Sequence, residues 1–239
     1  MITINKLQMK KLVVLSGAGM SAESGLKTFR EMGGLWEEYD VMEVASPDGF
    51  ASDPELVLRF YNERRKQLLS AKPNKGHLKL AELELLFDVE IVTQNVDNLH
   101  EKAGSSKILH LHGELMKSES TGDPGLVYEI EGWELNLGDK CEKGYQLRPH
   151  VVWFGEAVPA MENAIEIVST ADLFLVVGTS LNVYPAAGLI NYASLNCPIY
   201  LIDPNEVGVS VFGKKVEVIQ EGAGAGMEIL AKKLKKEYV

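Results

Sequence analysis

A short apolar run that leads directly into a glycine-rich turn is the feature that most limits how this chain can fold. Residues 13–22 read Val-Val-Leu-Ser-Gly-Ala-Gly-Met-Ser-Ala. Gly17 permits a tight turn, Gly19 lets a phosphate approach the backbone, and the small Ala22 allows a helix to pack closely on a sheet. A helix beginning near Ser21 would offer unpaired N–H groups to an anion. An ordinary strand-to-helix turn fits the same pattern, because a single match of this kind is weakly specific.

The segment after this turn differs from the next part of a dehydrogenase-type dinucleotide fold. That fingerprint expects a second strand ending in an acidic residue about 20 positions further on, where the carboxylate holds a ribose. Residues 25–39 instead contain a Gly-Gly break and no apolar run. The sequence therefore argues against a hydride-transferring dehydrogenase of that type.

The composition is that of a globular protein. The chain has 239 residues, of which 46% are hydrophobic, and this is enough for one large domain or for a large domain with a small insertion. The formal net charge of −10 disfavours nucleic acid as a partner, because a phosphate backbone would be repelled. We find no apolar run long enough to cross a bilayer and no signal-peptide core, so we expect a cytoplasmic protein without membrane contact.

Six short apolar runs rich in β-branched residues alternate with helical patterns. Runs that are apolar throughout are typical of parallel strands covered on both faces. The predicted strands are residues 12–16, 89–93, 108–111, 173–178, 199–203 and 216–220. We therefore predict an α/β fold with a doubly wound, parallel, Rossmann-like sheet. The glycine turn would lie at the carboxyl end of the first strand, where ligands bind in such sheets.

Two segments do not follow this alternation. Residues 30–74 look helical, and Asp53 followed by Pro54 is typical of a helix N-terminus. Residues 114–149 alternate weakly and are interrupted by glycines. We expect these two segments to form a second, smaller domain, with the chemistry in a cleft between the domains. The larger domain then comprises residues 1–29, 75–113 and 150–239.

Polar side chains follow the second predicted strand. The seven residues from Gln94 to His100 include Asn95 and Asp97. Carboxamides and a carboxylate at the end of a strand can bind ribose hydroxyls and an amide, although Asn and Asp are also common helix caps at such positions. One cap needs fewer polar groups than this run contains, which favours a binding role.

The third predicted strand leads into His110, His112 and Gly113. Alternation places both histidines on one face if the strand persists, and Gly113 would leave His112 accessible to a ligand. Neutral imidazole is a good base near physiological pH, so His112 is a candidate catalytic base. Two histidines at this spacing could also be structural or bind a metal, but no cysteine or carboxylate stands directly beside them.

Two further predicted strands end in polar residues. Gly178, Thr179 and Ser180 follow the most apolar run, and Asp203 and Asn205 follow the next one. In a parallel sheet these residues would lie at the same edge as the glycine turn. A nucleotide that spans several strand ends requires this arrangement.

Taken together, these motifs resemble the sirtuin family, the NAD-dependent protein lysine deacylases. The matching motifs are Gly-Ala-Gly-Met-Ser at 17–21, Thr-Phe-Arg at 28–30, Thr-Gln-Asn-Val-Asp at 93–97, His-Gly at 112–113, Val-Trp-Phe-Gly-Glu at 152–156 and Gly-Thr-Ser at 178–180. The resemblance covers almost the whole chain. It implies that NAD is consumed as a co-substrate.

The resemblance implies roles for the matching residues. His112 would be the general base, and Asn95 would also be catalytic. The residues that would bind NAD are Gly17, Ala18, Gly19, Ser21, Ala22, Thr28, Phe29, Arg30, Trp36, Gln94, Asn95, Asp97, Gly178, Thr179, Ser180, Asp203, Asn205 and Ala223. The residues that would bind the substrate are Tyr61, Arg64, Val152, Phe154 and Gly155, the last three by strand addition of the peptide.

The implied reaction transfers an acyl group from lysine to ADP-ribose. The acyl oxygen attacks the ribose carbon as nicotinamide leaves, and His112 then removes a proton from a ribose hydroxyl so that the acyl group migrates. The products would be free lysine, nicotinamide and an O-acyl-ADP-ribose.

Tyr61 and Arg64 stand three residues apart, hence on one face of a predicted helix, where a phenol and a guanidinium can converge on a carboxylate. Arg64 could equally be one of several surface cations. The pair resembles the acyl pocket of sirtuins that remove succinyl and malonyl groups, and Thr28 in place of the more usual Asp is similar to a bacterial member of that class. We therefore expect dicarboxylic acyl groups to be accepted alongside acetyl.

The chain departs from most sirtuins in its small domain. They hold a four-cysteine zinc site there, whereas Cys141 is the only cysteine in residues 114–149. We therefore expect no zinc and no other bound metal. The apolar cluster expected in its place consists of Tyr128, Trp133, Leu135 and Leu137.

Two other functions remain open at this point. A sirtuin-like protein can be a mono-ADP-ribosyltransferase, which uses the same co-substrate but modifies a protein, or a non-catalytic NAD-binding module. The resemblance favours a monomeric enzyme whose partners are acylated-lysine proteins or peptides.

Overall fold

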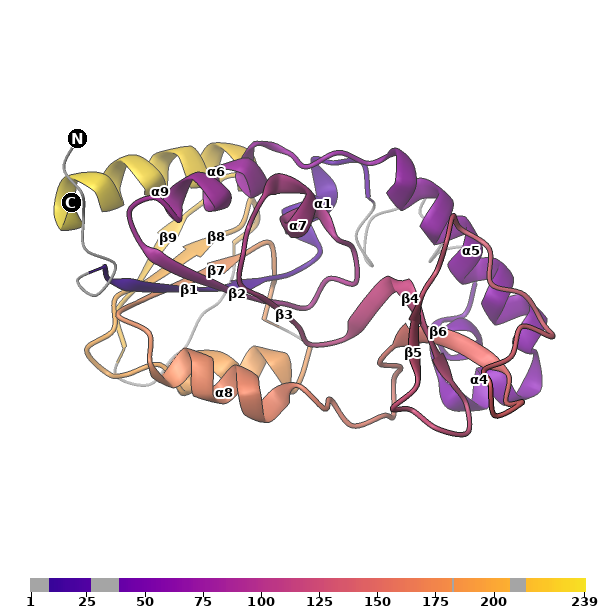
Figure 1. The fold of residues 1–239 in the computed structure, drawn as a ribbon. Coiled ribbons are helices and arrows are strands. Elements are labelled where there is room, and N and C mark those ends of the chain that lie inside the picture. The colour runs from indigo at the N-terminus through magenta and orange to yellow at the C-terminus, as the bar shows by residue number, and fades with distance from the viewer. Residues whose placement is uncertain (1–8, 27–38, 182, 207–213) are drawn as a thin grey trace.

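The structure, a computed structural model, describes residues 9–26, 39–181, 183–206 and 214–239. A six-stranded parallel sheet lies at one end of the molecule and a three-stranded antiparallel sheet at the other, each with helices packed against it (Figure 1). The predicted α/β fold with a second, smaller part is therefore confirmed.

The large sheet contains all six predicted strands, with ends that differ from the prediction by one residue. They are β1 (Lys11–Ser16), β2 (Asp88–Thr93), β3 (Ile108–His110), β7 (Leu173–Val177), β8 (Ile199–Ile202) and β9 (Val216–Ile219). Their order in the sheet is β3-β2-β1-β7-β8-β9. Counted along the chain this is 3-2-1-4-5-6, the order of dinucleotide-binding folds, whose ligands bind where the order reverses. Here the reversal lies between β1 and β7.

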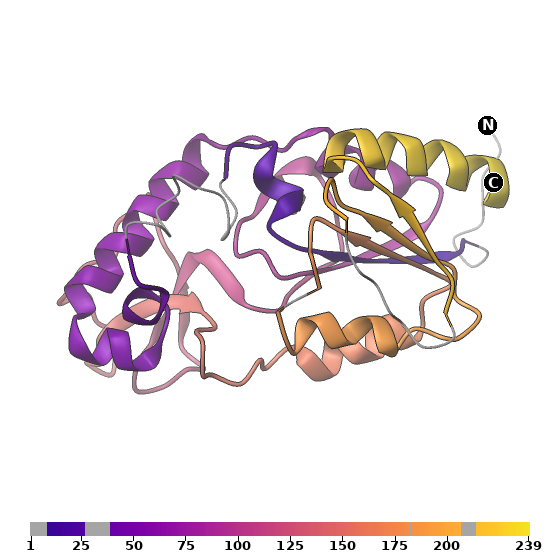
Figure 2. The same ribbon diagram turned by 180° about the vertical axis from the view of Figure 1, so that it is seen from behind.

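Helices cover both faces of this sheet (Figures 1 and 2). One face carries α6 (Lys75–Leu83) and α9 (Ala223–Tyr238). The other face carries α8 (Met161–Ser169) and the 3₁₀-helix η2 (Ala186–Asn191). Among the described residues, no helix combines the length and the apolar character needed to cross a membrane.

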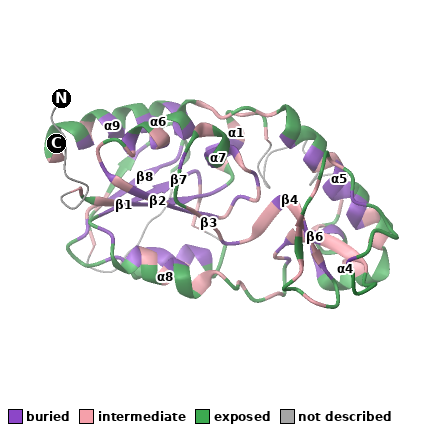
Figure 3. Cartoon of the chain, viewed as in Figure 1, coloured by how far each residue is buried: buried purple, intermediate pink, exposed green. Residues whose placement is uncertain are grey.

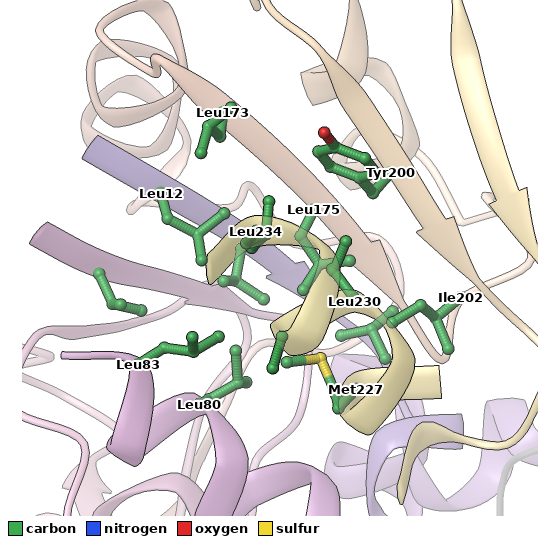
Figure 4. Packing of buried hydrophobic residues seen from close by; sticks show 14 of the residues in the cluster. Leu12, Leu80, Leu83, Leu173, Leu175, Tyr200, Ile202, Met227, Leu230 and Leu234 are labelled. Atoms are coloured by element: carbon green, nitrogen blue, oxygen red, sulfur yellow. The ribbon is translucent and has the colours of Figure 1, made fainter. Parts of the chain in front are cut away.

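The side chains of β1 alternate between the two cores. Leu12 packs with α6 and α9 in the first core (Figure 4), whereas Val13 packs with α8 and η2 in the second. Both residues have an exposed fraction of 0%. Burial on both faces explains why the strands read as continuous apolar runs, and Figure 3 shows it as buried strands between helices with exposed outer sides.

The first helix differs from the prediction. It is α1 (Gly19–Ala22), a single turn with Ala18 at its N-cap position, so it begins two residues before the expected Ser21. The turn that precedes it is therefore shorter than the glycine pattern alone indicated. The glycines form the start of the helix as well as the turn.

The expected helix after Asp53 is confirmed. The Asp53 side chain accepts a hydrogen bond of 2.9 Å from the Leu56 N–H, and Pro54 occupies the first turn of α5 (Pro54–Ser70). The described part of the chain also contains the short helices α3 (Val41–Val44), α4 (Pro47–Ser52) and α7 (Leu99–Ala103).

The small sheet has the order β5-β4-β6. Its strands are β4 (Gly113–Ser120), β5 (Val127–Glu129) and β6 (Leu147–Val151), all antiparallel. A core that includes Phe60 from α5 and Leu115 from β4 joins the sheet to the helices of residues 41–70. The sheet begins one residue before the expected segment 114–149 and ends two residues after it; the proposed domain boundaries stay a prediction.

The expected apolar cluster in the small domain was wrong. Of its four residues only Leu135 is fully buried; Leu137 is 52% exposed, and the Tyr128 hydroxyl bonds to the Glu142 carboxylate. Hydrogen bonds from α5 hold this segment instead. Such bonds join side chains to backbone groups far away in sequence, so the apolar pattern could not indicate them.

Asn62 and Arg65 make these bonds, and we call them the α5 clamp. The completely buried Arg65 donates from Nε to the Trp133 carbonyl at 2.8 Å and from a terminal nitrogen to the Leu115 carbonyl at 3.3 Å, while its other terminal nitrogen donates to the Asn62 side chain. Asn62 bonds both the N–H (3.0 Å) and the carbonyl (3.2 Å) of Leu135. Burial and, to a smaller extent, the charge of Arg64 lower the pKa of Arg65 to about 10, yet Arg65 stays charged at neutral pH. The clamp therefore ties the loop before β6 to the helix.

We expect Arg65→Met to lower the free energy of unfolding by about 2–4 kcal/mol, because it leaves the buried Leu115 carbonyl and the partly buried Trp133 carbonyl without their donor. Urea denaturation measures this change. Arg59→Met, on the exposed side of the same helix, removes the same charge and should change the stability by less than about 0.5 kcal/mol. Equal stabilities of the Arg65→Met and Arg59→Met variants would contradict the role of the clamp.

A chelator should not shift the unfolding midpoint of the wild-type protein, and metal analysis should find no stoichiometric zinc.

Candidate functional site

The carboxyl ends of β1 and β7 meet in two interlocked turns. The Gly17 N–H donates to the Val177 carbonyl at 3.0 Å, and the Gly19 N–H donates to the Gly178 carbonyl at 2.8 Å. A Cβ on Gly19 would lie 2.8 Å from Gly178 Cα. Gly178 has a φ of +64°, and a Cβ there would lie 2.1 Å from the Met20 nitrogen. Only glycines fit this close approach, which explains why residues 19 and 178 are glycines.

The loop after β2 is bonded to the glycine turn. The Asn95 amide donates to the Gly17 carbonyl at 3.1 Å and lies 3.2 Å from the Ser21 hydroxyl. Ser21 in turn donates to Asp97 at 2.9 Å, and the other Asp97 oxygen accepts from the Leu99 N–H at 3.1 Å. Burial raises the pKa of Asp97, while the bonds from Leu99 and Ser21 oppose that rise. The structure thus brings Asn95, Asp97 and Ser21 together, as expected.

Gln94 links this loop to both neighbouring strand ends and to His112. Its N–H donates to the Ser16 carbonyl at 2.9 Å, and its side-chain amide lies 3.3 Å from the Thr179 hydroxyl. Its carbonyl accepts from His112 Nδ1 at 3.1 Å. A carbonyl can only accept, so Nδ1 carries a proton and Nε2 of the neutral ring has a lone pair. Burial lowers the pKa of His112, although the Gln94 carbonyl opposes this, so the imidazole is neutral at physiological pH.

His110 contacts the same loop one residue further on. Its Nδ1 lies 2.9 Å from the Asn95 carbonyl, and its Nε2 lies 2.8 Å from the Glu101 carboxylate. Glu114 is close as well: in the described part of the chain, Glu101, His110 and Glu114 offer possible metal-ligand atoms within 4.8 Å of one another. Glu114, however, already pairs with Lys117 at 2.7 Å. The expected absence of a metal stays a prediction.

The end of β8 carries two further residues expected to bind NAD. Asp203, 7% exposed, accepts hydrogen bonds from the backbone N–H (2.9 Å) and the side-chain amide (3.2 Å) of Asn205. Ala223 begins α9 and is buried. Sequence reasoning missed Glu23, whose carboxylate accepts from the Gly224 N–H at 3.0 Å and so joins α1 to the start of α9. Its only sequence signal was an acidic residue close behind the glycine turn.

Tyr61 and Arg64 lie together on α5, as their spacing predicted. Arg64 Cζ lies 5.6 Å from the centre of the Tyr61 ring. The buried Tyr61 hydroxyl accepts from Trp153 Nε1 at 2.9 Å. Burial lowers the pKa of Arg64, whereas attraction to Tyr61 and to Asp97 opposes that change. Arg64 is therefore within electrostatic reach of the loop after β2, and Trp153, which sequence reasoning did not assign to the pocket, orients the phenol.

Residues 152–155 follow β6. The N–H of Val152 donates to the His112 carbonyl and the N–H of Phe154 to the Ala45 carbonyl, both at 2.9 Å. The Trp153 N–H donates to the Glu156 carboxylate at 2.7 Å. A peptide that paired with residues 152–155 would therefore bond to the carbonyl oxygens of this segment or to the N–H of Gly155. Phe154 is 45% exposed.

Four residues of the predicted NAD site lie outside the described residues. They are Thr28, Phe29, Arg30 and Trp36. Of the other residues predicted to bind NAD, Ala18 is the N-cap of α1, Ala22 is the last residue of α1, and Ser180 directly follows Thr179.

Comparison with known proteins agrees with this geometry. The model of the Sir2 family matches residues 17–185, more than half of the chain. The chain belongs to the Sir2 family. The match begins at the glycine turn and includes the loop after β2, His112 and the turn after β7.

Individual Sir2 relatives match nearly the whole chain. A protein of Bacteroides thetaiotaomicron named NAD-dependent protein deacylase is 56% identical over 227 residues, which cover 93% of this chain and 97% of the relative. The crystal structure of a Sir2 homologue with NAD has a TM-score of 0.85 and 40% identity, covering 95% of this chain and 90% of that one. A mutant Sir2 homologue with 2'-O-acetyl ADP-ribose also has a TM-score of 0.85 and 40% identity, covering 95% and 92%.

Proposed function

We propose that this chain is an NAD-dependent protein lysine deacylase that removes acetyl, succinyl and malonyl groups. The observation that carries the proposal is the position of His112. Its ring is neutral, its Nδ1 is held by the loop that also bonds the glycine turn, and its Nε2 lone pair is available as a base. The names of the relatives and the molecules bound to the Sir2 homologues support the same activity.

The residues at the strand ends fit a dinucleotide. Residues 17 and 19 carry no side chain that would cover the turn after β1, so a pyrophosphate could approach its backbone. Gly17, Gly19 and Ser21 would face the pyrophosphate. Asp203 and Ala223 would lie on the adenosine side, since β8 and α9 are on the far side of the order reversal.

The loop after β2 would hold the reacting half of NAD. Asn95 and Asp97 would orient the ribose next to nicotinamide, with Gln94 beside them. NAD supplies an electrophilic ribose carbon and nicotinamide as leaving group, and the acyl oxygen of the substrate is the nucleophile. His112 Nε2 then accepts a proton from a ribose hydroxyl, which allows the acyl group to migrate to that oxygen. A water molecule would then break the bond between the acyl carbon and the lysine nitrogen, which releases lysine and O-acyl-ADP-ribose; nicotinamide leaves in the first step.

Tyr61 and Arg64 would bind the far carboxylate of a succinyl or malonyl chain. The phenol accepts from Trp153 and so keeps its own proton for donation, and the guanidinium contributes a charge in a largely buried setting. Protein mono-ADP-ribosylation would use the same nucleotide site but has no need of this pair. The pair therefore favours deacylation.

The proposed function can be tested by incubating the purified protein with acetyl-, succinyl- and malonyl-lysine peptides, with and without NAD. We expect all three peptides to lose the acyl group, with one nicotinamide released for each lysine freed, and no reaction without NAD. Mass spectrometry of peptide and nucleotide products measures this. Gain of ADP-ribose on the peptide would indicate the transferase instead, and absence of nicotinamide release would indicate a binding module.

We expect Arg64→Met to reduce kcat/KM for desuccinylation by about 10- to 100-fold, the value of one charge-assisted hydrogen bond, while deacetylation falls by only a few fold. An acetyl group has no carboxylate, so it loses no interaction when the Arg64 guanidinium is removed. Arg59→Met is the matched control, because it removes a charge from the exposed side of the same helix. Equal losses for both acyl groups would contradict the pocket.

We expect deacylation to decline on the acid side only below pH 6.5, the ordinary pKa of histidine, because the pKa of His112 is lowered. The base form exists above that pKa, and activity is lost as the pH falls through it. His112→Gln should lower kcat by about 10²- to 10⁴-fold and remove this acid limb. His150→Gln, a histidine that pairs with Glu119 in the small sheet, should leave it in place. An acid limb above pH 6.5 would contradict the assignment.

A further inference from the structure

His110 sits between two groups that accept hydrogen bonds. Its side chain is 8% exposed. Nδ1 lies 2.9 Å from the carbonyl of Asn95, and Nε2 lies 2.8 Å from the carboxylate of Glu101 on α7. Neither a carbonyl nor an ionised carboxylate can donate. Both contacts are hydrogen bonds only if both ring nitrogens carry hydrogen, which makes the ring an imidazolium. A neutral ring can satisfy only one of them.

The surrounding charges favour that state. Burial by itself would lower the pKa of His110, but the hydrogen bond and charge of Glu101, the Asn95 carbonyl and the charge of Glu114 together raise it above the ordinary value. The pKa of Glu101 is correspondingly lowered, although its own burial opposes this, and Lys117 on β4 contributes to the lowering. Asp97 in the loop adds attraction, whereas His100 on α7 lies within reach of the His110 charge, which lowers the pKa of His100.

The Asn95 carbonyl is the last of three points that hold this residue. Its N–H donates to the Thr93 hydroxyl at 3.0 Å, and its side-chain amide donates to the Gly17 carbonyl and contacts Ser21. The N–H and the side chain are therefore fixed from the sheet and from the glycine turn. The carbonyl is fixed from His110, so the backbone on both sides of the Asn95 Cα is held in place.

We propose that Glu101 and His110 form a positioning pair, in which an imidazolium held by Glu101 fixes the Asn95 carbonyl and so keeps Asn95 oriented for nicotinamide release. This role rests on the proposed function. Neither residue contacts the reacting atoms. Since His112 must be neutral and His110 must be charged, the two histidines require opposite protonation states in the same pH range.

The pair formed by Glu101 and His110 should make the activity fall on the alkaline side of the pH profile. The folded-state pKa of His110 is raised, so the imidazolium is complete below the ordinary value and is lost as the pH rises through the raised one. One of its two hydrogen bonds is lost with the proton. The limb is opposite in direction to that of His112, and the two together give a bell-shaped profile.

Two amide substitutions separate the two contacts. In His110→Asn the side-chain NH₂ takes the place of Nδ1 and keeps the donor to Asn95, whereas in His110→Gln it takes the place of Nε2 and keeps only the contact with Glu101. We expect His110→Asn to retain kcat for nicotinamide release within about threefold and to lose the alkaline limb. His110→Gln should lose kcat by about 10- to 100-fold, with KM for the peptide unchanged, because a misplaced reacting group costs rate rather than peptide affinity.

Glu101→Gln keeps an acceptor and removes the charge. It should move the alkaline limb to lower pH, while Glu166→Gln, on the exposed side of α8, should not move it. If a His110 variant fails to fold, the Glu101→Gln variant still tests the proposal. NMR titration of the His110 ring, assigned by its absence in His110→Asn, should give a pKa above the ordinary value of 6.5. This measurement needs no turnover, so it separates the charged pair from the proposed function.

Three outcomes would overturn the proposal. They are a His110 ring that titrates at or below its ordinary value, equal rates for His110→Asn and His110→Gln, and an alkaline limb that Glu101→Gln leaves in place. A wild-type protein that releases no nicotinamide would contradict the proposed function and, with it, the positioning role. A high pKa of His110 in that protein would still support the charged pair.

Discussion

The close contact between the turns after β1 and β7 is the constraint on which the rest of the site depends. Gly19 donates to the Gly178 carbonyl at 2.8 Å, and neither position has space for a Cβ. This contact closes the gap that opens where the strand order reverses, between β1 and β7. Because two backbones meet there without side chains, their N–H and carbonyl groups form one polar surface. The loop after β2 bonds to that surface, since the Asn95 amide donates to the Gly17 carbonyl and the Gln94 amide lies 3.3 Å from the Thr179 hydroxyl.

The loop after β2 converts this fixed edge into a site. Three of its polar residues bond to other segments: Gln94 contacts Thr179 and His112, Asn95 donates to Gly17, and Asp97 accepts from Ser21. The same loop reaches the small sheet, since the Leu115 N–H donates to the Val96 carbonyl at 2.7 Å. Arg64 on α5 is within electrostatic reach of Asp97. The parallel sheet and the small sheet are therefore coupled through one short segment.

The sequence predicted the parts of this arrangement that depend on local pattern. Apolar runs predicted all six strands of the large sheet, and Asp53 with Pro54 predicted the start of α5. Contacts between distant segments had no such signal. Arg65 in a charged run of α5 looks like a surface residue, yet it is buried because the Trp133 carbonyl, 68 positions away, accepts its hydrogen bond. The apolar cluster expected near that residue was wrong for the same reason.

His110 and His112 illustrate how one structural difference sets opposite chemistry. Both rings are largely buried, and in both Nδ1 faces a backbone carbonyl of the same loop, so both begin from the same loss of hydration and the same gain of one acceptor. Burial alone disfavours the charged ring. For His112 this effect prevails and its pKa is lowered; for His110 the carboxylate of Glu101 at Nε2 reverses the outcome and its pKa is raised. The partner of Nε2 therefore determines which histidine can act as a base and which carries a fixed charge. Helix α7 places Glu101 beside the His110 ring and not beside the His112 ring.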